Sequence, residues 1–259
     1  MPEGLEAEIW RRACERLVGR QIVDVEVDDR VIAEGFAETM SGATFTGVRR
    51  LGKVVLLDTD GATIGLHFGM TGRLVVDGDA SIEKLAYASG RDEAEWDRLV
   101  MFAAPGGRTS APALRFNDPR RLGRVSLDPD LDHLGVDFSA VTPRRLAAAL
   151  TGRRGVLKSA LLDQHIVAGL GNLCVDEVLW WSDLDPRRTA DSLSVHDVER
   201  LASAIRRRLP IMLASGGSTY GVLSPAIRAT CPPCARDGAP LARLAIGGRT
   251  TIWCPRHQR

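Results

Sequence analysis

The C-terminal 29 residues contain residue types that bind metal ions. Two pairs with two-residue spacers are separated by 19 residues, and the four side chains are those of Cys231, Cys234, Cys254 and His257. Three thiolates and an imidazole suit a tetrahedral Zn²⁺ site, and such an ion replaces the hydrophobic core that a small ribbon lacks. We therefore expect a structural zinc ribbon. Zinc binding alone does not identify a function, because such ribbons serve many purposes.

The residues between the two pairs predict a β-hairpin. Residues 244–246 and 249–253 have compositions that favour strands, and Gly247-Gly248 between them suits a two-residue turn. We expect Arg249 at the exposed tip of this hairpin.

A second group able to do chemistry lies at the N-terminus, which reads Met1-Pro2-Glu3. A methionine before a small residue is routinely removed, which would leave a secondary amine beside a carboxylate. The pKa of an α-amine is about 8, against about 10.4 for lysine, so more of it is unprotonated at neutral pH and able to attack an aldehydic carbon. Glu3 would then transfer protons. The alternative is an ordinary helix start without a catalytic role.

Residues 1–128 predict an N-terminal helix packed on a β-sandwich. Apolar residues spaced four apart indicate an amphipathic helix over residues 3–18. The period then changes, and strands are expected at 21–27, 54–57, 63–68, 99–103, 113–116 and 124–127. Residues 104–112, rich in Gly, Pro and Ser, predict a flexible loop.

The strand pattern fades near residue 129, and residues 129–222 predict a helical domain. Thr142 is placed to cap a helix that begins at Pro143, and Ser194 to cap a helix that runs to about Leu213. Between them, helical stretches flank the glycine-rich turn 169–171, which predicts a helix-two-turn-helix unit. With the hairpin domain at 223–259, the expected fold is α+β and multidomain.

Composition and charge narrow the class of protein. The 259 residues are 44% hydrophobic and 26% charged, enough for two cores, and no apolar run reaches the ~20 residues of a membrane span. We expect a cytoplasmic protein with Cys14 and Cys174 as buried thiols. Lys and Arg number 17 against 24 Asp and Glu in residues 1–140, but 17 against 9 in residues 141–259. A positive half favours a polyanion-binding surface, although ordinary solvated charge gives the same count.

Six short segments occur along the chain in an order that is typical of one protein family. They are Met1-Pro2-Glu3, Gly52-Lys53, His67-Phe-Gly-Met70-Thr-Gly72, Arg115-Phe-Asn-Asp118-Pro-Arg120-Arg121-Leu-Gly123, Val167-Ala-Gly-Leu-Gly171-Asn172 and the terminal Cys/His quartet. Along its whole length the chain resembles the formamidopyrimidine-DNA glycosylase and endonuclease VIII family of base-excision repair enzymes. The resemblance implies a monomeric, bacterial, nucleoid-associated glycosylase and abasic-site lyase. Such an enzyme acts on duplex DNA through a Schiff base, cuts by β,δ-elimination and needs structural Zn²⁺ but no redox cofactor.

The resemblance also implies roles for single residues. Pro2 is the nucleophile, Glu3 transfers protons and Lys53 contacts the phosphate and the damaged nucleotide. On the DNA-binding side, Met70 fills the space left by the flipped base, Arg120 contacts the orphaned base, Leu122 stands at the wedge position, and Lys158, Asn172 and Arg249 bind phosphates. Simpler interpretations remain for three of them: Lys53 as a solvated turn lysine, Met70 as a core residue and Asn172 as a helix cap.

The chain departs from the family pattern at several positions. Leu122 replaces a phenylalanine, Cys174 a tyrosine and His257 the last cysteine ligand, and the spacer between the metal pairs is longer than usual. Only 14 residues separate Gly216 from Cys231, where members specific for oxidised purines have a longer loop. These differences favour oxidised pyrimidines, hydantoins or a broader set of lesions over strict 8-oxoguanine specificity.

Two other function classes are open at this point. A non-catalytic protein that binds damaged DNA could have kept the scaffold, although such a protein needs no nucleophile at Pro2. A zinc-ribbon RNA-binding factor would prefer single-stranded RNA, and Met70 would then have no role.

Overall fold

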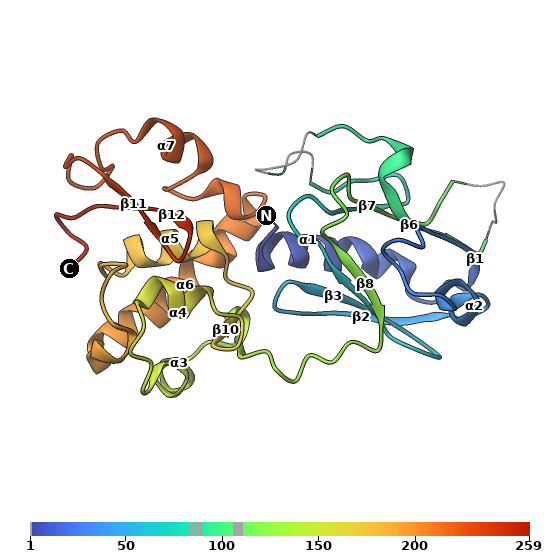
Figure 1. The fold of residues 1–259 in the computed structure, drawn as a ribbon, viewed down its shortest axis with the longest axis horizontal. Helices are drawn as coiled ribbons and strands as arrows, with labels where there is room; N and C mark the ends of the chain where they lie inside the picture. Colours follow the sequence, from blue (N-terminus) through green and yellow to red (C-terminus); the bar gives the residue numbers. More distant parts are fainter. Residues whose placement is uncertain (1, 83–84, 86–89, 106–110) are drawn as a thin grey trace. The chain divides into compact units, whose positions relative to one another are not determined.

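The computed structural model describes residues 2–82, 85, 90–105 and 111–259. Met1, Lys84 and residues 106–110 of the expected loop lie outside the described residues. Contacts divide the chain into two compact units, one of Pro2 and residues 6–131, the other of residues 3–5 and 132–259 (Figure 1). Both helices and sheets are present, which confirms the predicted α+β class.

The first unit holds two four-stranded antiparallel sheets, helix α2 (Phe36–Met40) and helix α1 (Gly4–Cys14) except its first two residues, which belong to the second unit. One sheet has the order β1-β6-β7-β5 and consists of Ile22–Val27, Asp97–Ala103, Leu114–Asn117 and Arg73–Val76. The other has the order β2-β3-β4-β8 and consists of Phe45–Leu51, Val54–Thr59, Ile64–His67 and Arg124–Leu127. Short 3-10 helices span Glu15–Leu17 and Ala94–Trp96.

The core of this unit joins α1 to the sheets. Trp10 of α1 lies with its ring centroid 4.1 Å from that of Phe68, and Phe68 lies 5.8 Å from Phe116 of β7. All three side chains are buried. The helix on a β-sandwich is therefore confirmed. Two strands of this unit, β2 and β5, were not predicted from the sequence. In β2, the adjacent Arg49 and Arg50 interrupt the alternation of apolar and polar residues. In β5, all four residues are buried, so exposed and buried positions do not alternate.

The second unit is mainly helical. Its helices are α3 (Pro143–Leu150), α4 (Leu157–Leu162), α5 (Asn172–Trp181), α6 (Val195–Ala214) and α7 (Pro225–Thr230), with 3-10 helices at Phe138–Ala140, Ala190–Ser192 and Ser218–Tyr220. Strands β9 (Val136–Asp137) and β10 (Val167–Ala168) pair in parallel. The predicted caps are confirmed: Thr142 Oγ1 accepts from the Arg145 amide, and Ser194 forms a capping box with Asp197.

The C-terminal ribbon is the antiparallel pair β11 (Ala242–Ile246) and β12 (Arg249–Trp253). Gly247 and Gly248 form its turn with φ of 55° and 71°, values that glycine adopts without strain, so the predicted hairpin is confirmed. The hairpin also has a small apolar core, made by Trp180, Leu223, Ile252 and Cys254. Because the ribbon belongs to the second unit by contact, its standing as a separate domain at 223–259 stays a prediction.

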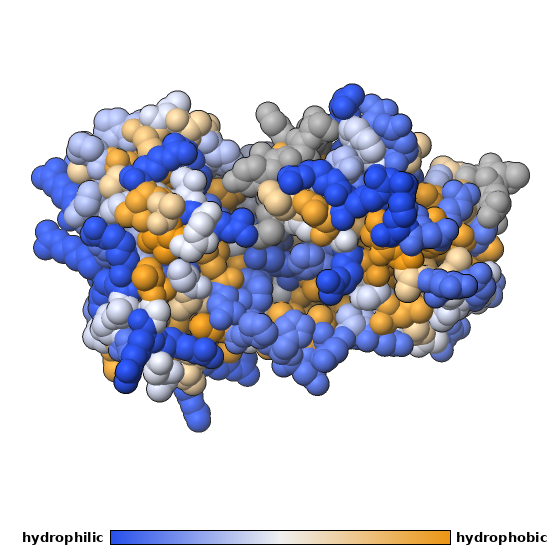
Figure 2. Space-filling view, in the orientation of Figure 1, coloured by the Kyte–Doolittle hydropathy of each residue, from blue (hydrophilic) through white to orange (hydrophobic). Residues whose placement is uncertain are grey.

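Cys14 and Cys174 are buried and are not in disulfides, as expected, and burial raises the pKa of the Cys14 thiol to about 12. Within the described residues, no helix combines the length and apolar character needed to cross a membrane. On the face shown in Figure 2, hydrophobic residues form separate small areas among hydrophilic ones.

Candidate active site and nucleic-acid interface

The carboxylate of Glu3 is bound by the N-terminal end of α5. Its Oε2 accepts from the amides of Gly171 and Cys174, both at 3.0 Å, and its Oε1 accepts from the amide of Leu173 at 2.8 Å. The side chain is 2% exposed. The first amides of a helix have no partners within the helix and carry a positive partial charge, so they are suited to hold an anion. The geometry fixes the position and orientation of this carboxylate.

Two glycines allow this close approach. A Cβ at Gly171 would lie 2.4 Å from Cδ of Glu3, so any larger residue displaces the carboxylate. Gly4 donates its amide to the carbonyl of Gly169 at 2.8 Å, and a Cβ at Gly4 would lie 2.6 Å from the Phe138 ring. The Gly169-Leu-Gly171 segment singled out in the sequence is therefore the surface against which residues 3 and 4 pack.

Asn172 and Arg249, both expected at DNA phosphates, occur in the same unit as Glu3. Asn172 is the first residue of α5, and its Nδ2 donates to the carbonyl of Thr250 at 3.1 Å. That bond uses one of the two donors of the amide. Arg249 is exposed at the start of β12, beside Thr250. The structure thus brings a phosphate-binding residue type on the helix close to the tip of the hairpin.

Lys158 lies in a different environment from the one expected for a phosphate ligand. Its side chain is fully buried, and its Nζ lies 2.6 Å from Asp176 Oδ1 and donates to the carbonyl of Thr250 at 3.1 Å. Burial lowers the pKa of Lys158, and Arg228 lowers it further, while Asp176 acts in the opposite direction. A buried ammonium paired in this way does not reach DNA, so the structure corrects the expected direct contact to an internal role.

In the first unit, Lys53 lies on the two-residue turn between β2 and β3. Gly52 in the same turn has φ of 57°, a conformation that favours glycine. Lys53 is half-buried. His67 on β4 has a pKa below its ordinary value, first because it is buried and then because Lys53 and Arg124 add positive charge nearby. The turn therefore places Lys53 in a locally positive region, where an anion is favoured.

Met70, Arg120 and Leu122 lie on two loops that contact each other. Nη1 of Arg120 approaches Sδ of Met70 at 3.8 Å, and Leu122 is 46% exposed. A Cβ at Gly69 would lie 2.3 Å from the carbonyl oxygen of Leu122. The two loops can therefore approach this closely only because residue 69 has no side chain. The structure brings these three sequence-predicted residues together.

Asp118 fastens the two loops and is fully buried. Its Oδ1 accepts from the Thr71 hydroxyl at 2.5 Å and from the Arg120 amide at 3.2 Å. Its Oδ2 accepts from the amides of Leu122 and Gly123, both at 2.7 Å. Asp118 falls in the quoted motif, but its role as the anchor of both loops was not predicted, because one of its partners, Thr71, lies 47 residues away in the chain.

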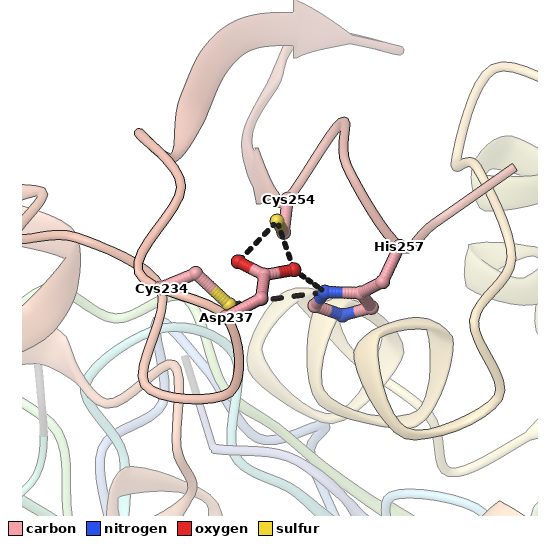
Figure 3. A group of neighbouring side chains, drawn as sticks. All are labelled: Cys234, Asp237, Cys254 and His257. Atoms are coloured by element: carbon pink, nitrogen blue, oxygen red, sulfur yellow. Dashed lines mark hydrogen bonds and ion pairs between the residues drawn. The ribbon is translucent and has the colours of Figure 1, made fainter.

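Four side chains near the C-terminus form a candidate metal centre (Figure 3): Cys234, Asp237, Cys254 and His257. Their ligand atoms all lie within 4.8 Å of one another. Asp237 Oδ2 is 2.9 Å from His257 Nδ1, and its two oxygens are 3.4 and 3.5 Å from Cys254 Sγ. A tetrahedral ion with bonds of about 2.0–2.3 Å keeps its ligand atoms about 3–4 Å apart, so these residues fit Zn²⁺.

Cys231 lies outside this group of four, so its place in the predicted quartet stays a prediction. It ends α7 in a left-handed conformation with φ of 45°, and its amide donates to the Ile227 carbonyl at 2.8 Å. Because the helix extends to the preceding residue, Cys231 acts as its C-cap. Asp237 follows Cys234 with the same two-residue spacer that separates Cys254 from His257, and this was the signal that the sequence contained.

Comparisons with known proteins agree with this geometry. Residues 1–125 match the N-terminal domain of formamidopyrimidine-DNA glycosylase, and residues 134–224 match its H2TH domain. The chain is 34% identical to a formamidopyrimidine-DNA glycosylase of Paracoccus denitrificans, with 98% of this chain and 99% of the relative covered. It is 36% identical to that of Moorella thermoacetica, with 99% and 92% covered.

Solved structures give the same result. A mutant Fpg of Lactococcus lactis in complex with Fapy-dG containing DNA matches with a TM-score of 0.81 at 25% identity, covering 100% of both chains. The wild-type protein in complex with DNA containing an oxidised pyrimidine matches with a TM-score of 0.80 at 25% identity, again over 100% of both chains. By both sequence and structure, the chain belongs to the formamidopyrimidine-DNA glycosylase family.

Proposed function

We propose that this chain is a DNA glycosylase with abasic-site lyase activity, which removes oxidised bases from duplex DNA and cuts the strand by β,δ-elimination. The observation that carries the proposal is the buried Glu3 carboxylate, held by three amides at the start of α5. Directly before it, Pro2 becomes a secondary amine once Met1 is removed. The family and its DNA-bound structural relatives support damaged DNA as the substrate.

In the proposed reaction the Pro2 nitrogen attacks C1′ of the damaged nucleotide. The new N–C1′ bond forms as the bond between C1′ and the base breaks, and the base leaves with the electron pair and takes up a proton. Protonation of the ring oxygen opens the sugar and gives the iminium, with Glu3 as the proton-transfer group. Loss of a C2′ proton expels the 3′-phosphate, a second elimination expels the 5′-phosphate, and water releases the amine.

The loop pair in the first unit supports a role in base flipping. Extruding a nucleotide leaves a gap in the stack and costs a few kcal/mol, which inserted side chains offset. Met70 and Leu122 are the residues we assign to this gap, and Arg120 to the unpaired partner base. The contact between Met70 and Arg120 supports their acting as one group.

Phosphate contacts are assigned to Lys53, Asn172 and Arg249. Asn172 stands at a helix N-terminus, where phosphates are favoured, and Arg249 is exposed on a hairpin. The zinc ion would be structural and would hold the loops at the base of this hairpin. In this proposal the protein binds duplex DNA as a monomer.

The lesion class follows from two features of this chain. Leu122 presents a smaller wedge than an aromatic residue. The segment between Gly216 and Cys231 is short. It is also held in place, because the Glu177 carboxylate accepts hydrogen bonds from the amides of Val222 and Leu223 at 3.0 Å. We propose oxidised pyrimidines, hydantoins or a broader set as substrates, to be checked with a panel of single lesions in duplex DNA.

Borohydride trapping on duplex DNA with an abasic site tests the enzymatic function. Protein shown by mass spectrometry to lack Met1 should form a covalent adduct. Pro2→Gly replaces the secondary amine by a primary one and should suppress adduct formation and strand cleavage, and Glu3→Gln should slow strand cleavage by about 10²-fold or more. The exposed Glu199→Gln on α6 is the matched control and should behave as wild type. A free Pro2 that yields no adduct contradicts the proposal, and DNA binding without trapping would instead favour a non-catalytic damaged-DNA-binding protein.

A further inference from the structure

A buried polar network surrounds Asp176 in the second unit. Asp176 is 1% exposed, and its Oδ1 lies 2.6 Å from Lys158 Nζ. Its Oδ2 accepts from Arg228 Nη1 at 2.5 Å and from the Ile252 amide at 3.1 Å. One carboxylate of α5 therefore binds cations from α4 and α7 and the backbone of β12.

The carbonyl oxygen of Thr250 is the second centre of this network. It accepts from Arg228 Nη2 at 2.5 Å, and from Lys158 Nζ and Asn172 Nδ2 at 3.1 Å. Arg228 is 7% exposed and spans both centres, with one nitrogen on Asp176 and the other on Thr250. The planar fork of a guanidinium suits such a bridge, whereas an ammonium does not.

The location of the network gives it a consequence beyond stability. Thr250 directly follows Arg249 at the hairpin tip, and Asn172 begins the helix whose next amides hold Glu3. The network thus joins the arginine assigned to phosphate binding to the helix end that holds the catalytic carboxylate. Buried ion clusters are weak sources of stability compared with apolar packing of similar volume, but their paired charges fix the geometry of the segments that carry them.

We propose that Asp176 and Arg228 are positioning residues. They hold Thr250, the residue after Arg249, against the N-terminal end of α5. Arg249 and Asn172 can then bind the phosphates around the lesion at the same time. This inference rests on the proposed function. Neither residue touches DNA, because both are buried. Their effect on DNA affinity is exerted through Arg249.

A double-mutant cycle tests this coupling with the full-length, metal-loaded protein. The four proteins are wild type, Arg228→Met, Arg249→Ala and the double variant, and the measurement is Kd for a duplex with a tetrahydrofuran abasic analogue. We expect each single variant to weaken binding about tenfold, and the double variant to bind about as weakly as either single one. Single-turnover borohydride trapping at saturating DNA should change less than twofold in Arg228→Met.

Arg187→Met is the matched control, because it removes the same charge from the same unit. Arg187 pairs with Asp185 and lies over the Trp253 ring, whereas Arg228 pairs with Asp176 and Thr250. Its Kd should stay within twofold of wild type. Arg228→Lys keeps the charge but not the fork, and should fall between wild type and Arg228→Met. If Arg228→Met does not fold, as judged by circular dichroism and metal content, Arg228→Lys replaces it in the cycle.

Independent effects that multiply in the double variant would overturn the inference, and so would an Arg228 variant with wild-type Kd. A saturating trapping rate that falls as strongly as affinity would likewise contradict a role confined to positioning for capture. Failure of the proposed catalytic function has a different signature, since wild type would then give no adduct, whatever the four Kd values of the cycle.

Discussion

At the scale of single residues, the position of the Glu3 carboxylate depends on the close approach of the backbone of residues 171–174. Three amides of the 171–174 segment surround its carboxylate, and Gly171 leaves no space for a side chain. This arrangement separates the roles of the two N-terminal residues. In the proposed reaction, Pro2 supplies a nucleophile whose reactivity is a property of its amine, whereas Glu3 depends on the fold to hold its carboxylate in place.

Gly171→Ala should therefore impair catalysis without changing a catalytic residue. The new Cβ would collide with Glu3, so the carboxylate must move, and misplacement by about 1 Å can reduce the rate by ~10²-fold. Strand cleavage of abasic-site DNA under single-turnover conditions measures the effect. Gly155→Ala is the control, because a Cβ there meets nothing within 4 Å and its φ is not in the left-handed region. Equal rates for the two variants would show that the collision has no consequence.

The metal centre gives a second prediction at this scale. Asp237→Ala should lose a ligand and release Zn²⁺ to a chelator at lower chelator concentration than wild type, while Cys231→Ser should retain one equivalent. Metal analysis after dialysis against a graded chelator series measures both. The reverse result, with metal lost from Cys231→Ser and kept by Asp237→Ala, would restore the quartet expected from the sequence.

At the scale of elements, the two loops that carry Met70 and Leu122 share one buried carboxylate, that of Asp118. Asp118 accepts four hydrogen bonds from residues 71, 120, 122 and 123, and Arg98 donates to its carbonyl at 2.8 Å. Arg98 and Arg121 in turn pair with Asp28. Burial acts to raise the pKa of Asp28, but hydrogen bonds from Arg121, Arg30 and Arg98 outweigh it and hold the pKa below its usual range.

Asp118→Ala should loosen both loops, because it leaves several donors without an acceptor, each at a cost of about 1–3 kcal/mol. Hydrogen exchange read by NMR at the amides of Leu122 and Gly123 should become faster. The amides of β3 and β4 should change less, since they pair within their own sheet. Unchanged protection at residues 122 and 123 would mean that Asp118 does not anchor the loops.

At the scale of the whole molecule, charge is distributed unevenly along the chain. The excess of Lys and Arg lies in residues 141–259, which form most of the second unit. Binding to a phosphate backbone releases counterions in proportion to the cationic contacts, so affinity falls with salt. Apolar insertion into the base stack releases none.

The salt dependence should therefore distinguish the two kinds of contact. Arg249→Ala should lower the slope of log K against log [salt] for duplex DNA by about 0.9, the value for one phosphate contact. Leu122→Ala should weaken binding to abasic-site DNA at every salt concentration with the slope unchanged. A change of slope in Leu122→Ala, or none in Arg249→Ala, would show that these residues contact the DNA differently from our assignment.

The sequence by itself determined the elements whose signals are local. The caps at Thr142 and Ser194 and the Gly247-Gly248 turn depend on residues adjacent in the chain, and all three have the predicted form. The strands expected within residues 1–128 were also found, whereas β2 and β5 were not predicted. The motif order identified the family for the same reason, because it is a property of the chain alone.

Only the tertiary structure decided which partners the buried charges have. Lys158 is of a residue type that binds phosphates, but its ammonium group is paired with Asp176 and Thr250, which lie 18 and 92 positions away in the sequence. Likewise, Asp237 lies with Cys234, Cys254 and His257, and Glu3 accepts hydrogen bonds from amides nearly 170 residues distant. A buried charge must find its counter-charge in space, and packing selects that partner from segments whose separation no local pattern records.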